Sequence, residues 1–381
     1  MWYKIKPLDT LFFRDGRPFS MGAETWANPI FPPYPSTVYG AIWTWLIFER
    51  GSLKEFEDGK YKDELGRIIK DEKTNLKEVK KGNLTIKGPF IWLDNNIYFP
   101  VPCDFLKKKG APQSEKNNLF YIDCINKPEI FISDYPLERI LINKEDFGLE
   151  ECDEFLDITS LKDYLMGNKV TVGFTEKDEI FIKEKKTGIK RSRKTLSSEE
   201  GYLYRIPMIR LKKEASLFIE IDGLEQNNYP KGGIIQIGGE GKTAKIEKIE
   251  NDDPLKVLRD LNFKFENKTF KLYLATPTIF KKGWLPEWID NSTFEGKYKE
   301  AIKLKLIACS IGKFNLIGGW DLANKRPKPM YKLVPAGSVY YFKILDDTPA
   351  ERIKAVFHLK NISDINPEEG FGLSFVGEVK L

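Results

Sequence analysis

Cationic side chains gather in one short stretch of this sequence. Residues 183–194 hold seven cations against a single anion, Glu184. Clustered lysine and arginine form an electrostatic footprint for polyanions such as a nucleic acid backbone. The alternative is a solvated loop in a lysine-rich chain. We favour phosphate binding, and the candidate contacts are Lys190, Arg191, Arg193 and Lys194.

A second candidate for phosphate binding is the glycine-rich stretch 238–242. Glycine has no Cβ, so successive backbone N–H groups can curl around an anion, and the lysine that follows adds positive charge. The spacing does not fit the GxxxxGK[ST] phosphate loop. A tight turn before a strand is the alternative interpretation. The candidate contacts are Gly238, Gly239, Gly241 and Lys242.

Loop residues near the N-terminus supply arginines and aromatic rings. Arg14 and Arg17 flank an Asp-Gly pair. Arginine suits bidentate phosphate binding and stacking on unpaired bases, although Asp15 is an alternative, internal partner for one of them. Trp26 and Phe31 follow in the same loop. Exposed rings of this kind either stack on bases or anchor a protein partner.

Trp284 and Trp288 lie in a corresponding loop of the second half of the chain. Loops usually run over the surface, so we expect these two rings, with Trp26 and Phe31, to anchor a partner subunit. The alternative is that they fold back as lids on their own domain.

The sequence gives little support for catalysis. His358 is the single histidine, lies between apolar residues and is expected to be structural, so a two-histidine acid–base nuclease is excluded. The four cysteines lack the CxxC spacing of a zinc site. We therefore expect no catalytic residue, no metal and no cofactor.

Two pairs of segments echo one another along the chain. Residues 4–16 and 271–283 are apolar runs that each end in two large hydrophobes, a cation, one more residue and a glycine. Residues 238–241 and 369–372 are glycine-rich and each leads into an apolar, strand-like run. Repetition at this scale indicates two copies of one domain type, with chance similarity between strands as the alternative.

Hydrophobic periodicity predicts the elements that position these residues. Helices are expected from Ser36 to Gly51, through the charged region 54–81, and after Thr348. Strands are expected at 2–13, 85–93, 97–101, 174–182, 202–209 and 216–221, with the basic stretch as a loop between 174–182 and 202–209.

This order predicts an α+β fold of two tandem ferredoxin-like (RRM-like) domains with insertions. The 381 residues exceed what a single core usually fills, and we expect domains at 1–250 and 263–381, with a basic hairpin inserted at about 170–222. No signal peptide or membrane span is read, so a cytoplasmic protein without membrane contact is expected. Abundant lysine and glutamate with scarce glutamine is typical of a thermophile.

Five motifs carry a family resemblance. They are FRDGRPF at 13–19, PPYPSTVYG at 32–40, GGEG at 238–241, GGWD at 318–321 and VPAGSVY at 334–340. Together, and in this order, they resemble the signatures of the third subunit of the Cmr complex. That family consists of RAMP proteins of the Cas-five-like group in type III-B CRISPR effectors.

The resemblance implies a non-catalytic RNA-binding subunit that holds the 5′ tag of the guide crRNA in antiviral defence. It also implies docking to the large polymerase-like Cmr subunit and contact with the backbone RAMP subunits. The alternative function is a metal-independent RAMP endoribonuclease that processes guide RNA, since Tyr, Lys and Ser can serve as acid and base. A protein scaffold that touches no RNA is a third possibility.

Overall fold

The structure is a computed structural model, and it combines α-helices with a larger share of β-strand. It describes residues 1–14, 29–72, 74–110, 119–128, 134–168, 170, 174–192, 194–195, 197–250, 253–299, 301–321 and 323–379. Three residues predicted to bind RNA or a partner, Arg17, Trp26 and Arg193, lie outside these ranges.

The chain forms two compact units, each assembled from three separate stretches. The first unit contains Met1–Asp94, Asp178–Glu250 and Leu316–Tyr331. The second contains Asn95–Lys177, Asn251–Asn315 and Lys332–Leu381. The division predicted from the sequence, 1–250 and 263–381, was contiguous and differs chiefly in where 95–177 belongs.

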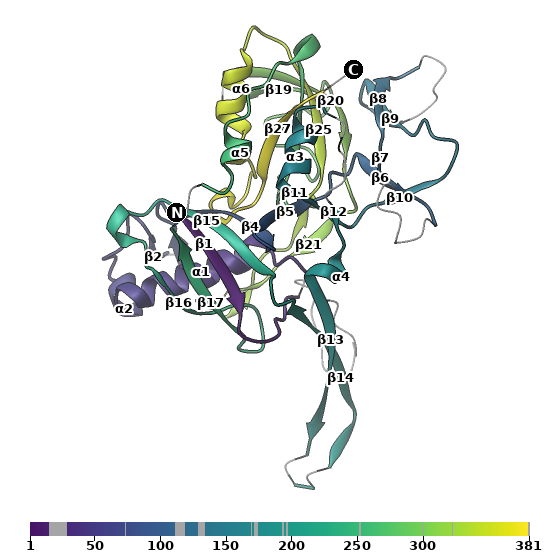
Figure 1. The fold of residues 1–381 in the computed structure, drawn as a ribbon. Coiled ribbons are helices and arrows are strands. Elements are labelled where there is room, and N and C mark those ends of the chain that lie inside the picture. Colours follow the sequence, from purple (N-terminus) through teal and green to yellow (C-terminus); the bar gives the residue numbers. More distant parts are fainter. Residues whose placement is uncertain are drawn as a thin grey trace. The chain divides into compact units, whose positions relative to one another are not determined.

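The first unit contributes five neighbouring strands of a larger sheet, in the order β4-β15-β1-β17-β16 (Figure 1). They are β1 (Trp2–Pro7), β4 (Thr85–Leu93), β15 (Ser216–Asp222), β16 (Gly232–Gln236) and β17 (Thr243–Ile249). Neighbouring strands in this order, from β4 to β16, run antiparallel. The first strand was expected to reach residue 13, but it ends at Pro7, and an irregular segment follows.

Helix α1 (Pro35–Arg50) packs on this sheet, as predicted. Val38, Ile42 and Trp45 are buried at helical spacing, and Trp45 meets Tyr3 of β1 edge to face at 5.9 Å between ring centroids. The cap is Tyr34 rather than the predicted Ser36, because Pro35 occupies the first helical position, where its missing N–H costs nothing.

The region 54–81 was predicted to be helical, and that prediction is wrong beyond a single short helix, α2 (Leu53–Glu57). Strands β2 (Arg67–Lys70) and β3 (Lys77–Lys80) follow as an antiparallel pair. Gly59 and Gly66 have φ angles of +79° and +91°, a left-handed conformation that ends a helix. A Cβ on Gly66 would also lie 2.1 Å from the Lys80 carbonyl oxygen.

Figure 1 shows β13 (Phe181–Arg191) and β14 (Ser198–Leu211) as a long two-stranded ribbon. A basic hairpin was expected here, but with its cations in a loop. Instead residues 183–191 belong to strand β13 itself, and the connection shrinks to residues 192–197. Strands β13 and β14 pair without interruption from Phe181–Leu211 to Ile189–Leu203. An exposed two-stranded ribbon does not have to bury either face, so polar residues can occupy both faces of the strand, and a run of cations is compatible with a strand here.

The second unit has a six-stranded antiparallel sheet in the order β19-β20-β25-β18-β27-β26. Its strands are β18 (Thr269–Leu274), β19 (Glu295–Tyr298), β20 (Ile302–Ser310), β25 (Val339–Ile344), β26 (Lys360–Asn361) and β27 (Leu373–Glu378). Helix α6 (Ala350–Phe357) was predicted after Thr348, and it buries Ile353 and Phe357.

Smaller elements complete the two units. They include β5 (Asn96–Pro100), β6 (Phe105–Lys108), β7 (Leu119–Tyr121), β8 (Asp123–Asn126), β9 (Arg139–Ile142), β10 (Leu149–Glu151), β11 (Phe155–Asp157), α3 (Ile158–Leu165), β12 (Phe174–Thr175), α4 (Lys177–Ile180), α5 (Lys256–Arg259), β21 (Asn315–Ile317), β22 (Trp320–Asp321), β23 (Arg326–Pro327) and β24 (Tyr331–Leu333). Among the residues described, no helix is long and apolar enough to cross a membrane.

Candidate nucleic-acid interface

Three segments of the first unit meet at the base of the β13–β14 hairpin. Leu11, from the segment after β1, exchanges two backbone hydrogen bonds with Ile209 of β14, at 2.7 and 2.8 Å. The N–H of Gly239 donates to the carbonyl of Phe12 at 2.9 Å. The hairpin base and the glycine-rich loop therefore share one anchor, although they are more than 25 residues apart in sequence.

The glycines of the loop are needed for two different reasons. Gly238 has φ +78°, and a Cβ there would lie 2.6 Å from the Phe12 carbonyl oxygen. Gly241 has φ +63° but open space around it. The first glycine permits close approach of two backbones, whereas the second serves only the turn. The stretch thus forms the tight turn that was the alternative interpretation, and its outer residues 239–241 are exposed, so the predicted anion contact stays a prediction.

Several cations at this base are paired with acids. Lys242 Nζ lies 2.9 Å from an Asp9 carboxylate oxygen, and Arg210 lies 3.0 Å from the other. Arg210 also forms an ion pair with Glu184. The hydrogen bond from Lys242 holds the pKa of the Asp9 carboxyl well below its usual range. The positive charge of Lys242 is therefore already partly neutralised by Asp9 before any anion binds at the glycine-rich loop.

Further along the hairpin, cations outnumber acids. Lys183 and Lys185 are exposed on β13, and Lys194 is exposed in the connection. Lys186 is also exposed and pairs with Glu240 of the glycine-rich loop at 3.2 Å. Lys190 and Arg191 lie on the last turn-proximal positions of β13. The positive charge thus follows the length of the ribbon away from its acid-paired base.

The N-terminal loop contributes less than expected within the described residues. Arg14 is exposed and forms an isolated bridge with Pro29. Phe31 is half-buried and packs on Phe181 at 4.6 Å between ring centroids. Its ring therefore supports the start of the hairpin strand within its own unit.

The two tryptophans of the second unit have different surroundings. Trp288 packs among Phe342, Phe357 and Tyr298, with centroid distances of 5.3 to 6.3 Å. Trp284 is 37% exposed and stacks on Phe294, at 6.3 Å between ring centroids. Trp288 follows the alternative in which a ring folds onto its own domain, whereas Trp284 keeps a face toward solvent.

Sequence reasoning missed a buried polar cluster in the second unit. Asp104 is fully buried and accepts hydrogen bonds from Tyr164 at 2.7 Å and Tyr341 at 2.5 Å. Lys271 Nζ sits 3.3 Å above the Tyr164 ring. Burial lowers the pKa of Lys271 to about 8 and raises that of Asp104. No local signal marks these residues, because they are distant in sequence and each is ordinary by itself.

His358 is structural, as predicted. Its Nε2–H donates to the Leu258 carbonyl at 2.8 Å, and its Nδ1 accepts from the N–H of Val376 at 3.2 Å. Burial lowers the pKa of the imidazole to about 4. In the described part of the chain, no group of three or more histidine, cysteine or acidic side chains is placed to hold a metal ion.

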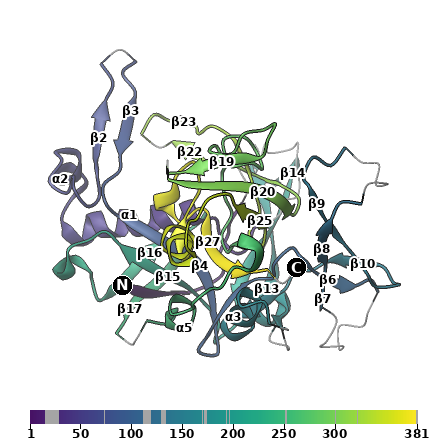
Figure 2. The same cartoon turned by 90° about the horizontal axis from the view of Figure 1, so that it is seen from above.

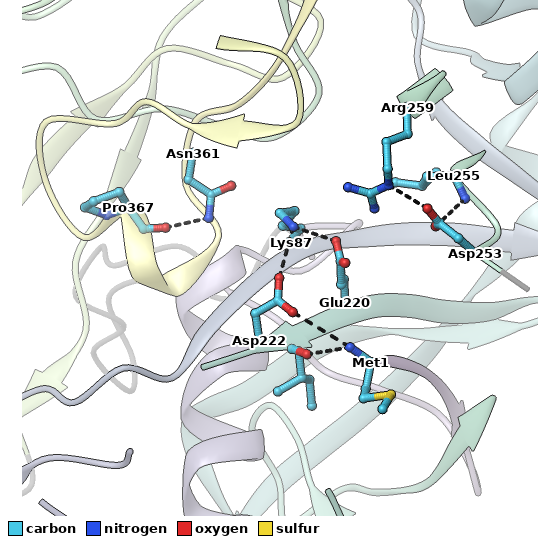
Figure 3. A network of polar contacts seen from close by, with 10 residues as sticks. Met1, Lys87, Glu220, Asp222, Asp253, Leu255, Arg259, Asn361 and Pro367 are labelled. Atoms are coloured by element: carbon cyan, nitrogen blue, oxygen red, sulfur yellow. Dashed lines mark hydrogen bonds and ion pairs between the residues drawn. The ribbon is translucent and has the colours of Figure 1, made fainter. Parts of the chain in front are cut away.

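Figure 3 shows two further polar contacts that order strand and helix ends. Lys87 bridges Glu220 at 2.7 Å and Asp222 at 3.1 Å, and the N-terminal amine of Met1 donates to the Ile221 carbonyl at 2.8 Å. These contacts fix the start of β1 against β15. In the second unit, Asp253 accepts from the N–H of Leu255 and from Arg259, which orders the start of α5.

A family model described as CRISPR-associated protein (Cas_Cmr3) matches residues 3–379. The chain belongs to the Cmr3 family. The match covers almost all of its length, and it confirms the resemblance to the third subunit of the Cmr complex that the five motifs indicated.

One curated relative and two solved structures are similar to this chain. The CRISPR system CMR subunit Cmr3 of Saccharolobus solfataricus is 25% identical over 350 residues, which cover 90% of this chain and 86% of the relative. A chain in a cryo-EM structure of type III-B Cmr-beta bound to cognate target RNA and AMPPnP has a TM-score of 0.50 at 19% identity, with 90% and 86% coverage. A structure of Cmr-beta bound to cognate target RNA gives a TM-score of 0.49.

Proposed function

We propose that this Cmr3-family chain is a non-catalytic, RNA-binding subunit of a type III-B CRISPR Cmr effector complex in antiviral defence. The observation that carries the proposal is the cationic β13–β14 ribbon, anchored at its base beside an accessible glycine-rich loop. The RNA that this subunit binds is the 5′ tag of the guide crRNA. Proteins hold single-stranded RNA with positively charged surfaces that follow the phosphate backbone of the RNA.

The same proposal includes the architecture of two tandem ferredoxin-like domains. In a ferredoxin-like unit, the second strand along the chain neighbours the third, the third neighbours the first, and the first neighbours the fourth. The order β4-β15-β1-β17 has this pattern, and so has β20-β25-β18-β27. A ferredoxin-like unit also places one helix after its first strand and another after its third. In the first unit α1 follows the first strand, and in the second unit α6 follows the third.

The partners in this proposal are the large polymerase-like Cmr subunit and the backbone RAMP subunits, and the complex acts in the cytoplasm. The exposed face of Trp284 is the candidate anchor for a subunit contact. Support comes from family membership and from the relatives, one a CMR subunit and one solved within a Cmr-beta complex.

Salt dependence of RNA binding tests the proposal. Replacing Lys190, Arg191, Arg193 and Lys194 by Ser should weaken binding of tag-containing guide RNA. Each lost phosphate contact should flatten the slope of log affinity against log salt by roughly 0.7. Thermal unfolding should change little, because exposed positions such as Lys194 usually contribute little to stability.

A matched variant supplies the control for general loss of charge. It replaces four exposed lysines of the second unit, Lys264, Lys297, Lys343 and Lys360. The proposal requires the two variants to differ in slope. Equal slopes of log affinity against log salt in the two variants would show that the ribbon is a solvated run of charges and does not bind the RNA.

The alternative function, a metal-independent guide-RNA endoribonuclease, gives a separate outcome. Purified chain incubated with repeat RNA in EDTA should leave the RNA intact. Specific cleavage that persists through further purification would replace the binding proposal with the enzymatic one. Crosslinking of the assembled complex separates the third possibility, because a scaffold would yield no guide-RNA crosslink to this chain.

A further inference from the structure

Trp320 is the most exposed tryptophan among the described residues, with 56% of its surface accessible. It begins β22, which pairs with β23 through Trp320–Pro327 and Asp321–Arg326. We call residues 320–327 the Trp320 hairpin. A large ring left this open on a folded unit usually marks a contact surface.

The Trp320 hairpin is held in place by side-chain amide contacts. Asn324 Oδ1 accepts from the N–H of Lys77 at 2.8 Å, and Asn324 Nδ2 donates to the Lys77 carbonyl at 2.7 Å. Asp321 in turn accepts from the backbone N–H and from Nδ2 of Asn324. Figure 2 shows β22 and β23 together with the β2–β3 pair that contains Lys77. The Trp320 ring therefore belongs to a hairpin that is hydrogen-bonded to β3 within the first unit.

Cationic residues follow Trp320 closely in the sequence of this hairpin. Lys325, Arg326 and Lys328 are all exposed, and Asp321 is the single acid between residues 316 and 331. Asp321 is engaged by Asn324 and lies 3.9 Å from Arg326 Nε. Within this stretch of sequence, three cations therefore stand against one acid.

We propose that the Trp320 hairpin is a second RNA contact, in which Trp320 stacks on an unpaired base and Lys325, Arg326 and Lys328 face the flanking phosphates. An exposed ring among cations is the arrangement with which proteins bind single strands independently of sequence. Centres of protein–protein interfaces are instead depleted in lysine. This inference rests on the proposed RNA-binding function but on residues separate from the β13–β14 hairpin.

Anisotropy titrations of the full chain with fluorescein-labelled eight-residue oligo(A) and oligo(U) test this site. Trp320→Ala should weaken binding by roughly 5- to 150-fold, the range expected for loss of one base–aromatic stack. Trp320→Phe should recover most of it. The salt slope should stay unchanged in Trp320→Ala, because stacking releases no counterions, and should flatten when Lys325, Arg326 and Lys328 become Ser.

Phe48→Ala is the matched control, because Phe48 is 61% exposed on α1 of the same unit and should leave RNA binding unaltered. Wild-type affinity in a folded Trp320→Ala variant, alongside weakened binding in the β13–β14 variant, overturns this inference and leaves the proposed function standing. Intact RNA affinity with loss of co-purifying Cmr subunits overturns it as well, and assigns the ring to a protein contact. Loss of affinity in Trp320→Ala alone supports the site and counts against the ribbon.

Discussion

Lys4 and Lys271 occupy the same place in the two units. Each is the third residue of the strand with the first-strand position, β1 or β18, and each strand pairs on both sides. Lys4 is half-buried, and its Nζ lies 4.5 Å from the centroid of the Trp92 ring. Lys271 is 2% exposed and lies over Tyr164 beside buried Asp104.

The difference between the two lysines comes from what covers each sheet. Asp104 and Tyr164 belong to 95–177, the stretch that the second unit takes from the middle of the chain. Two strands of similar sequence thus differ in side-chain environment, with a buried ionisable cluster on one and a partly solvated lysine on the other. Similar sequence gives similar backbone pairing here, whereas the environment of a side chain depends on the segment packed against it.

Removing the charge of each lysine tests this difference most directly. Lys271→Met leaves Asp104 buried without its cation and should lower the free energy of unfolding by about 3–5 kcal/mol. Lys4→Met should change it by less than about 1 kcal/mol, the value of a partly solvated cation–π contact. Urea unfolding followed by circular dichroism measures both.

The double variant Lys271→Met, Asp104→Asn separates charge from packing. Removing both charges should restore most of the lost stability, since a neutral pair of similar volume needs no compensating charge. If the double variant is as unstable as Lys271→Met alone, the methylene packing of Lys271 matters and its ammonium group does not.

His358 gives the second unit an acid sensitivity that comes from a buried imidazole, a side chain that the first unit lacks. Because its pKa falls from the unfolded value of about 6.5 to about 4, the unfolded chain binds more protons between these pH values. The imidazole should therefore cost about 3 kcal/mol of stability as pH falls from 7 to 4. His358→Gln, whose amide can make both hydrogen bonds, should remove this portion of the acid sensitivity. Parallel acid profiles in both proteins would contradict the assignment.

The two glycine-rich loops provide a further comparison between the units, with smaller expected effects on stability. Gly239 N–H bonds Phe12 in the first unit, and Gly372 N–H bonds Pro277 in the second, each at 2.9 Å. Gly238→Ala should destabilise by about 3 kcal/mol, because it adds a close contact with Phe12 to a strained φ. Gly241→Ala, with open space, should cost about 1 kcal/mol. Thermal unfolding of the two variants checks the difference, and equal losses would show that φ strain dominates.

Much of the local structure followed from the sequence. Helix α1, helix α6 and the strand at 85–93 were predicted from apolar spacing and from Pro and Gly at their ends, which are short-range signals. The basic hairpin and the glycine-rich turn were also found from composition. The helix expected over 54–81 failed because Gly59 and Gly66 adopt left-handed conformations that favour turns over helical continuation.

By itself the sequence determined the family, the paired glycine-rich loops and the cationic stretch, since these depend on residue type and order. Only the tertiary structure decided that Lys242 is paired with Asp9 and that Trp288 lies among core rings while Trp284 stays exposed. It also decided that Lys271 lies over the ring of Tyr164, whose hydroxyl donates to Asp104. Each of these outcomes depends on segments brought together from far apart in the chain. Such contacts are set by the packing of whole units, which no local pattern of residues encodes.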